Sequence, residues 1–316
     1  MNSTGMLTSL TKTDFHFKQQ ESVYHGKVRD VYFLQDKLII IASDRISAFD
    51  HILPRPIPYK GQVLNLIAAY FLEHVKDICP VWLESVPDPN VSVGKRCNPI
   101  PIEVVVRHCL AGHAWRVYKS GVRELCGVKM PDGMREGEAF PQPIITPTSK
   151  AAAGHDEDMS YSEILRNKIV TPALLDNIYQ KAFAISQRGK NMALDKKLIL
   201  VDTKYEFGLH NGELTLMDEI HTPDSSRYYL AEGYAERMDS GQAQTQLSKE
   251  FVREWLMDNG FAGQIGQQMP AMPDDFVSQV SARYIELYEK LTGKIFQKNG
   301  EQDILNRIEV NLKSFF

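Results

Sequence analysis

Residues 198–220 carry a strong β-hairpin signal, and this hairpin limits the folds open to the chain. Two strand-like segments flank Asn211-Gly212, a dipeptide preferred in two-residue hairpin turns. The apolar run LILV at 198–201 indicates a strand start that is buried on both faces. We therefore expect an antiparallel sheet in which part of this hairpin lies in the core.

The remaining segments predict hairpin strands and helices in similar measure. The nearly continuous apolar run at 100–106 is typical of a strand buried on both faces. Because strands occur in hairpins as often as between helices, we expect an α+β fold. The other predicted elements are strands at 31–34 and 37–42, a helix from Gly61, a helix from Pro172 that stops at Gly189, and a helix at 274–291.

The chain has 316 residues, enough for two domains or lobes. We place the boundary near the apolar run at 100–106, which predicts a β-rich N-terminal lobe at 1–105 and an α+β lobe at 106–316. Residues 127–159 are rich in glycine and proline and show little periodicity, so they predict a long loop that serves in binding.

Composition narrows the class of protein. The net charge of -4 and pI near 6.2 give no overall reason to bind nucleic acid or an anionic membrane. The four cysteines lack CxxC spacing, and the first 14 residues do not resemble a secretory signal. No apolar run approaches the ~18 residues of a membrane-spanning helix. We expect a cytoplasmic enzyme with free thiols.

The hairpin gathers acids around one lysine. Strand alternation places Asp202, Lys204 and Glu206 on one face, and Asp218 lies on the second strand. Carboxylates from adjoining strands suit Mg²⁺, which completes its octahedron with waters and phosphate oxygens. The alternative is that this face is simply exposed to solvent.

The register of this hairpin provides a test of the shared metal. With a two-residue turn, Glu206 pairs with Met217, and Asp218 then points away from Glu206. A shared metal therefore predicts an extra residue, either in a three-residue loop or in a bulge at Gly208.

A second candidate region is YHGKVRDVYF at 24–33, where Gly26 precedes Lys27 and Arg29. A glycine turn flanked by cations can place backbone N–H groups and charged tips against a polyphosphate. A turn glycine beside two solvated cations is the alternative.

Two further clusters follow apolar strands. The stretch ASDRISAFDHILP at 42–54 holds Asp50 beside other charged residues, and VVVRHCLAGHAW at 104–115 holds Arg107 and His113. An arginine that leaves a core strand needs an anion or a carboxylate. The alternatives are a salt-bridged turn at 42–54 and a structural ion pair at Arg107.

The segment PTSKAAAGHDEDMS at 147–160 combines hydroxyls, a lysine and acids. Such a set of donors and acceptors suits an amino acid substrate, and a solvated loop explains it almost as well. We predict substrate contacts from Asp50, Ser149, Lys150 and Asp156.

Taken together, GKVRDVY, SDRISAFD, VVVRHCLAGHAW, PTSKAAAGHDEDMS and LILVDTKYEFGLHNGELTLMDEIHTPDSSR, in this order, closely resemble the SAICAR synthetase family. The likeness runs from about residue 22 to the final third and points to the longer, yeast-like branch. It implies a two-lobed α+β fold with a kinase-like ATP cleft and antiparallel sheets flanked by helices. The implied reaction joins CAIR, the 5-aminoimidazole ribonucleotide carboxylate, to L-aspartate with ATP and Mg²⁺.

The resemblance also implies roles for single residues. The implied metal ligands are Glu206 and Asp218, with Lys204 and Asp202 in the same nucleotide and metal cleft. Other implied roles are ATP-phosphate contacts from Gly26, Lys27 and Arg29, adenine near Glu103, CAIR contacts from Arg107, His113 and Arg227, and closure on the substrate by Arg253. His113 stands where shorter members carry serine.

Two other functions remain open. A kinase-like phosphotransferase would need a hydroxyl acceptor and a general base, for which Asp50 or Asp156 could serve. A non-catalytic nucleotide-binding module would not need paired metal acids. The coexistence of the CAIR motifs with the metal motif favours the ligase. We expect the 127–159 loop and the Arg253 segment to close over bound substrate.

Overall fold

The computed structural model describes residues 9–150, 157–298 and 303–316. The chain forms two compact units, one made of residues 1–70, 83–96 and 247–316 and the other of residues 71–82 and 97–246. The C-terminal 70 residues therefore pack with the N-terminal part, and the units do not follow the division at residue 105 that we expected. The functional assignment of the two lobes stays a prediction.

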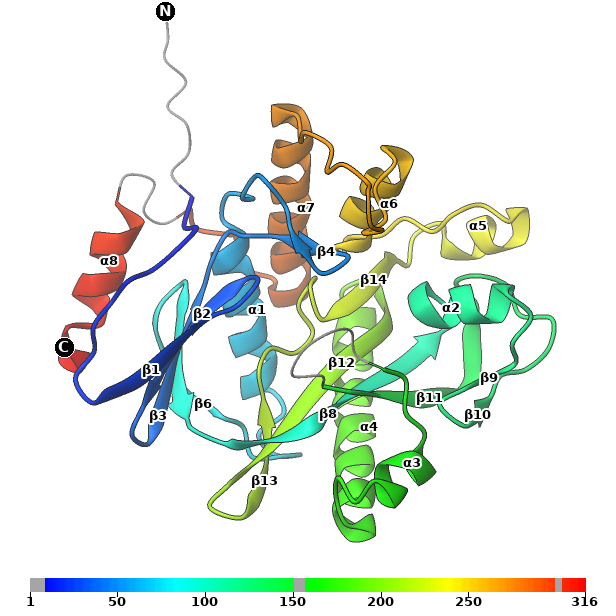
Figure 1. Ribbon diagram of the computed structural model, residues 1–316. Coiled ribbons are helices and arrows are strands. Elements are labelled where there is room, and N and C mark those ends of the chain that lie inside the picture. The colour runs from blue at the N-terminus through cyan, green and yellow to red at the C-terminus, as the bar shows by residue number, and fades with distance from the viewer. Residues whose placement is uncertain (1–8, 151–156, 299–302) are drawn as a thin grey trace, which may run out of the picture. The chain divides into compact units, whose positions relative to one another are not determined.

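Unit 1 contains a five-stranded antiparallel sheet in the order β1-β2-β3-β7-β6 (Figure 1). The predicted strands at 31–34 and 37–42 are confirmed within β2 and β3. The strands are β1 (Gln20–His25), β2 (Arg29–Leu34), β3 (Lys37–Ala42), β6 (Leu83–Asp88) and β7 (Val91–Lys95), and β4 (Ser47–Ala48) pairs with β5 (His51–Ile52). The helices are most of α1 (Lys60–Glu73), α6 (Glu250–Asp258), α7 (Asp274–Thr292) and α8 (Ile304–Asn311), followed by the short turn η1 (Lys313–Phe315).

One face of this sheet forms a core with the C-terminal helix α8. Alternate residues of β2, β3 and β7 point to the same face, as strand geometry requires. Arg307 of α8 also binds the buried Asp88, with its Nε 2.9 Å from Oδ2. The buried members of the core are Leu10, Phe17, Tyr32, Leu34, Ile39, Ile41, Val91, Val93, Ile304, Ile308 and Leu312.

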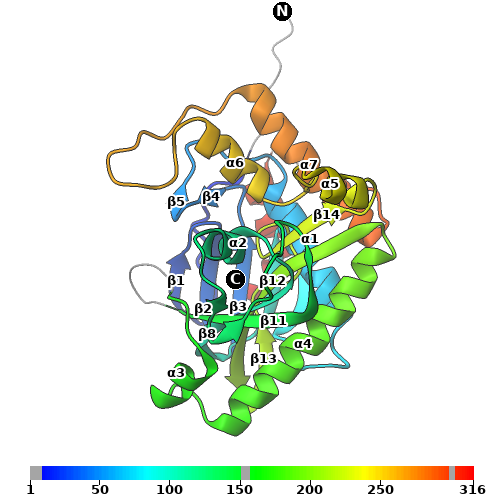
Figure 2. The ribbon, with the colours of Figure 1, turned by 90° about the vertical axis from the view of Figure 1, so that its right-hand side faces the viewer.

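Unit 2 contains a second antiparallel sheet in the order β11-β8-β12-β13, with β14 also paired to β12. Helix α4 packs along β8 and β12 (Figures 1 and 2). The strands are β8 (Asn98–Cys109), β9 (Glu124–Leu125), β10 (Val128–Lys129), β11 (Ala139–Ser149), β12 (Leu198–His210), β13 (Glu213–Met217) and β14 (Ser226–Leu230). The helices are α2 (Gly112–Lys119), α3 (Tyr161–Arg166), α4 (Pro172–Leu194) and α5 (Tyr234–Ser240).

The α+β class with antiparallel sheets is confirmed, but two predicted elements differ from the structure. Residues 127–159 are not one long loop, because β11 pairs with β8 from Ile144 to Ser149. Two prolines lie where this pairing is irregular, between Ala139 and Ile144, and β11 is an edge strand, where proline costs least. The run at 100–106 is buried on one face only, since Pro101 is exposed and full burial begins at Val106.

Helix α4 begins where the sequence predicted and ends later. The Thr171 hydroxyl caps it by accepting a bond from the Leu174 N–H, 3.3 Å away. Gly189 does not stop the helix, which continues to Leu194. A Cβ at Gly189 would lie 2.3 Å from the ring of His221, so glycine is needed there for close packing. Among the described helices, none is long and apolar enough to cross a bilayer.

The imidazole of His221 lies in the core with that of His108, and both are buried. Burial lowers the pKa of His108 to about 4, with Lys190 adding to the shift. Burial, with the charge of His108, lowers the pKa of His221 to about 3. Unfolded histidines bind protons near pH 6.5, so unfolding takes up protons between that pH and about 4. These two groups therefore make the fold less stable as the pH falls through this window.

We expect His108→Gln to weaken this pH dependence. Between pH 6.5 and 5 the His108 shift alone removes about 2 kcal/mol of unfolding free energy. Urea unfolding of wild type and variant at both pH values measures the difference. An equal loss in the two proteins would contradict the assignment to His108.

Candidate active site

The β12–β13 hairpin has the simple two-residue turn, so the extra residue predicted from the shared metal is wrong for this strand pair. Asn211 and Gly212 have φ of 51° and 82°, both in the left-handed region that a type I′ turn needs. The register pairs Glu206 with Met217 without interruption. The irregularity near Gly208 lies instead in the pairing of β12 with β8.

The side-chain direction of Asp218 is not set by strand alternation. Strand β13 ends at Met217, and Asp218 has a φ of 56°, so its side chain direction no longer follows from register. The indole of Trp82 donates to the Asp218 carbonyl at 2.9 Å. The charge of Asp218 is close enough to raise the pKa of Lys204. The left-handed conformation thus frees Asp218 from strand alternation, and its charge lies close enough to Lys204 to act on that lysine.

Lys204 holds the acids of the hairpin together. Its ammonium lies 2.8 Å from Glu103 Oε1 and 2.6 Å from Glu206 Oε1. Glu103 and Glu206 face each other across the β8–β12 pair. Burial lowers the pKa of Lys204, but the three carboxylates Glu206, Glu103 and Asp218 together hold it well above its usual value. The lysine therefore stays positively charged in the middle of the cluster.

Glu206 is held between two lysines. Its second carboxylate oxygen accepts a bond from Lys150, which follows the edge strand β11. Burial alone would raise the pKa of Glu206, but Lys204 and Lys150 lower it well below the usual range. Glu206 is thus ionised at neutral pH. The Lys150 contact was not foreseen, because strand alternation carries no information about a residue beyond a distant strand.

Asp202 binds two arginines at once. Its Oδ2 lies 3.0 Å from NH1 of Arg107 and 2.6 Å from NH1 of Arg227. The Nε of Arg107 also donates to the Thr146 hydroxyl at 2.8 Å. Asp202 and Arg107 are both buried. Arg107 forms a structural ion pair here, and the same pair places two guanidinium groups side by side, as an anion-binding site requires. Both interpretations of Arg107 are therefore compatible with the structure.

Helix α2 begins against Arg227. A Cβ at Gly112, which has a φ of 55°, would lie 2.4 Å from the guanidinium carbon of Arg227, so only glycine permits this approach. The next residue, His113, has its Nε2 2.7 Å from Oδ2 of Asp158. This bond is the main cause of the lowered pKa of Asp158. Asp158 had not been singled out from the acids of its segment.

The segment around residue 150 is anchored at both described sides. The Ser149 N–H donates to the Glu157 carbonyl at 2.8 Å, and the Glu157 N–H donates to the Ser149 hydroxyl at 3.1 Å. The Lys150 N–H donates to the Pro101 carbonyl at 3.1 Å. Asp156, also predicted as a substrate contact, lies outside the described residues.

The remaining predicted site residues belong to unit 1. Gly26 begins the turn that connects β1 with β2 and donates its N–H to the Arg29 carbonyl at 2.7 Å. The Lys27 ammonium lies 2.5 Å from Oδ1 of Asp50, in the β4–β5 turn. In helix α6, Arg253 NH1 lies 3.0 Å from Oε2 of Glu250.

The donors fit magnesium by type. Glu103 and Glu206 bind Lys204, and the charge of Asp218 lies close enough to raise its pKa. Carboxylates are the ligands that Mg²⁺ takes beside waters and phosphate oxygens. Over the described ranges, no group of three or more His, Cys, Asp or Glu side chains is arranged to hold a metal by itself. A site built from two carboxylates therefore needs ligands from the nucleotide and from water.

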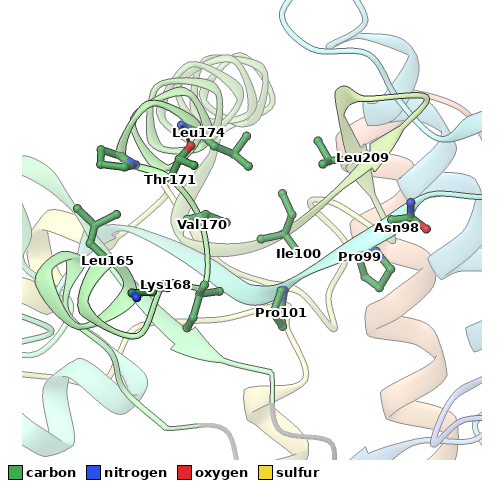
Figure 3. A pocket seen from close by; sticks show the side chains of 12 residues that line it. Asn98, Pro99, Ile100, Pro101, Leu165, Lys168, Val170, Thr171, Leu174 and Leu209 are labelled. Atoms are coloured by element: carbon green, nitrogen blue, oxygen red, sulfur yellow. Dashed lines mark hydrogen bonds between the residues drawn. The ribbon is translucent and has the colours of Figure 1, made fainter.

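A cavity of about 580 Å³ lies elsewhere in unit 2 (Figure 3). Ile100, Val170 and Leu174 are labelled around it, and residues from the start of β8, from the α3–α4 connection and Leu209 form its wall. None of the predicted site residues lines it. Its lining is mostly apolar, with Asn98, Lys168 and Thr171 as polar members, and it contains none of the carboxylates and arginines of the charged cluster around Lys204 and Asp202.

Comparison with known proteins identifies the family. The model of SAICAR synthetase matches residues 22–270. The phosphoribosylaminoimidazole-succinocarboxamide synthase of Bacteroides thetaiotaomicron is 57% identical over 98% of this chain and 99% of its own, and that of Cytophaga hutchinsonii is 53% identical over 97% and 99%. The solved SAICAR-synthase from Saccharomyces cerevisiae, complexed with SAICAR, superposes with a TM-score of 0.78 at 31% identity and covers 92% of this chain and 100% of its own. The chain belongs to the SAICAR synthetase family.

Proposed function

We propose that this chain is an ATP-dependent ligase that joins the carboxylate of CAIR to the amine of L-aspartate. The products are SAICAR, ADP and phosphate, in de novo purine biosynthesis. The proposal rests on the 57% identity, over nearly the whole chain, to a phosphoribosylaminoimidazole-succinocarboxamide synthase. The charged cluster around Lys204 supplies the chemistry that such a reaction needs.

A carboxylate is a poor electrophile, and this sets the order of steps. The CAIR carboxylate oxygen attacks the γ-phosphorus of ATP, and ADP leaves. The aspartate amine then attacks the acyl carbon, phosphate departs, and the amine loses a proton. Phosphoryl transfer depends mainly on positioning and on neutralising charge. The site must therefore supply fixed cations and exclude water.

Lys204 and Asp202 are the proposed catalytic residues of unit 2. Lys204 remains protonated because of its carboxylate neighbours, so it can offset the charge on the transferring phosphoryl group. Asp202 fixes the guanidinium groups of Arg107 and Arg227. These arginines suit the 5′-phosphate and the carboxylate of CAIR, because guanidinium groups bind such anions in a planar, bidentate way. His113, which binds Asp158 through Nε2, is the third proposed contact to CAIR.

Glu206 and Asp218 are the proposed ligands of Mg²⁺. When bound, the ion neutralises charge on the ATP phosphates. Glu206 itself binds both Lys150 and Lys204, which holds the two lysines in place until the phosphates arrive. Lys150 is the group that must leave Glu206 to contact the substrate.

The nucleotide contacts in unit 1 are the turn residues Gly26, Lys27 and Arg29. We place adenine along the strand segment that carries Glu103, as in a kinase-like cleft. The Glu103 carboxylate itself binds Lys204. The remaining proposed substrate contacts are Asp50, Ser149, Lys150 and Asp156. Arg253 is the third proposed catalytic residue, and it acts when its segment closes on the substrate.

We place the enzyme in the cytoplasm as a monomer or small homo-oligomer, with no nucleic-acid or membrane partner. All four cysteines are free thiols, which supports a reducing compartment.

The decisive experiment measures ADP release with CAIR and aspartate supplied separately and together. We expect release coupled to SAICAR formation only when both are present. Robust ADP release with a sugar or inositol instead would point to a kinase, and binding of ATP without turnover would point to a binding module.

Closure over the substrate is a separate prediction. An acyl phosphate hydrolyses in water, so a segment must cover it. We expect α6, which carries Arg253, and the described parts of residues 127–159 to gain hydrogen-exchange protection when an ATP analogue and CAIR bind together. The C-terminal helix α8 is the internal reference. No added protection in either segment would contradict closure.

A further inference from the structure

The turn that connects β1 with β2 has two peptide donors that the fold does not use. Gly26 and Arg29 close the turn through the Gly26 N–H. Throughout the described part of the chain, no hydrogen-bond acceptor meets the N–H of Lys27 or Val28. Lys27 is one of the residues that the family resemblance assigns to the ATP phosphates, and Val28 lies between Lys27 and Arg29, which is another.

Arg45 binds the carbonyls of the same turn. Its NH2 lies 2.9 Å from the Gly26 carbonyl oxygen, and its Nε lies 3.3 Å from that of Lys27. Its NH1 donates to the Thr11 carbonyl. One planar guanidinium therefore spans two successive peptide groups of the turn.

The Arg45 side chain is itself fixed by Asp30. The NH2 of Arg45 lies 2.8 Å from Oδ1 of Asp30. The other oxygen of Asp30 accepts the N–H of Thr13 at 2.9 Å and its hydroxyl at 2.8 Å. Burial raises the pKa of Asp30, but the bonds from Arg45, Thr13 and His25 lower it below its usual value. The arginine thus binds a buried, fully ionised carboxylate.

Ser43 fixes the far end of the turn. Its hydroxyl lies 2.8 Å and its N–H 3.0 Å from the Val28 carbonyl oxygen. The carbonyls of Gly26, Lys27 and Val28 are therefore all bound by residues 43 and 45. These two residues lie just after strand β3, so the sheet fixes the position of the residues that bind the turn.

Trans peptide geometry then fixes the direction in which the N–H groups of this turn point. The described peptide bonds are all trans, and in a trans peptide the C=O of one residue points opposite to the N–H of the next. Because Arg45 binds the carbonyls of Gly26 and Lys27, the N–H groups of Lys27 and Val28 point away from it. Adjacent N–H groups that point the same way form an anion site.

We propose that Arg45 is a positioning residue for ATP: it holds the peptide N–H groups of Lys27 and Val28 toward the nucleotide phosphates. This inference rests on the proposed use of ATP and adds a residue that touches the loop rather than the ligand. The sequence left the segment at 42–54 open between a ligand-binding loop and a salt-bridged turn, and it assigned no separate role to Arg45.

The variant Arg45→Lys distinguishes the positioning role of Arg45 from the effect of its positive charge. An ammonium keeps the positive charge but cannot span two carbonyls and a carboxylate in one plane. Arg307 provides a matched control, since it is also a partly buried arginine on a fully buried aspartate: the side chains are 12% and 0% exposed for Arg45–Asp30, and 18% and 0% for Arg307–Asp88.

The test measures dissociation constants of ADP and adenosine, with melting temperatures, for the full-length wild type, Arg45→Lys, Arg45→Gln and Arg307→Lys. We expect both Arg45 variants to bind ADP about tenfold more weakly, a loss of about 1.4 kcal/mol, with unchanged adenosine affinity. In the SAICAR assay the KM for ATP should rise, while the KM for CAIR stays constant. Arg307→Lys should lower the melting temperature without changing ADP affinity.

Wild-type ADP affinity in Arg45→Lys would overturn the inference, because charge alone would then suffice. Equal losses for ADP and adenosine, or the same ADP loss in Arg307→Lys, would also overturn it, because the effect would then be general destabilisation. ADP binding is measured without turnover, so failure of the ligase assay and failure of this inference are separate results.

Discussion

Glu206→Gln is expected to lower kcat/KM by about 100-fold or more at fixed Mg²⁺, the size of effect seen when one preorganised electrostatic group is removed. Glutamine keeps the shape but leaves Lys150 and Lys204 without the anion between them. It also removes one of two proposed metal ligands, so the Mg²⁺ concentration for half-maximal activity should rise. Initial rates over a Mg²⁺ titration measure both changes.

The control for this variant is Glu213→Gln, which changes an exposed carboxylate in the same hairpin. It should keep wild-type rates and Mg²⁺ dependence. Full Mg²⁺-dependent activity in Glu206→Gln would remove Glu206 from the metal site.

Asp202→Asn is expected to lower the free energy of unfolding by about 3 kcal/mol, because it leaves buried Arg107 facing Arg227 without the carboxylate that both bind. The KM for CAIR should also rise, since the two guanidinium groups lose their common anchor. Urea unfolding gives the first quantity and steady-state kinetics the second.

Two further variants test this explanation. Asp274→Asn breaks the exposed pair with Arg55, in which the aspartate side chain is 90% exposed, and should cost less than about 1 kcal/mol. Adding Arg107→Met to Asp202→Asn should recover part of the stability, because one uncompensated charge is gone. A double variant that is less stable than Asp202→Asn would contradict charge repulsion as the cause.

The active-site acids show which side-chain placements can be predicted from a local sequence pattern. Alternation correctly placed Lys204 and Glu206 on one face of a strand, since side-chain direction there depends only on neighbours in sequence. The same rule misplaced Asp218, because its left-handed backbone conformation follows the end of the strand. A shared metal requires an extra residue only if the second strand continues through Asp218, and β13 ends at Met217.

Long-range packing decided the other differences. The sequence could not show that Gly189 faces the ring of His221 rather than ending a helix, because those residues are separated in sequence by a loop and a hairpin. Likewise, the prolines of β11 hid a strand whose place at the sheet edge tolerates them.

By itself, the sequence determined the α+β class, the hairpin with its Asn211-Gly212 turn, the α7 helix with its glycine end, and the family, whose motifs are short and contiguous. Only the tertiary structure decided that Lys150 reaches Glu206, that Asp202 binds two arginines, and that Arg45 supports the turn at Gly26. Turn and helix signals depend on backbone preferences of adjacent residues, so a linear reading finds them. Contacts between distant strands depend on sheet order and register, which emerge only when the whole core packs.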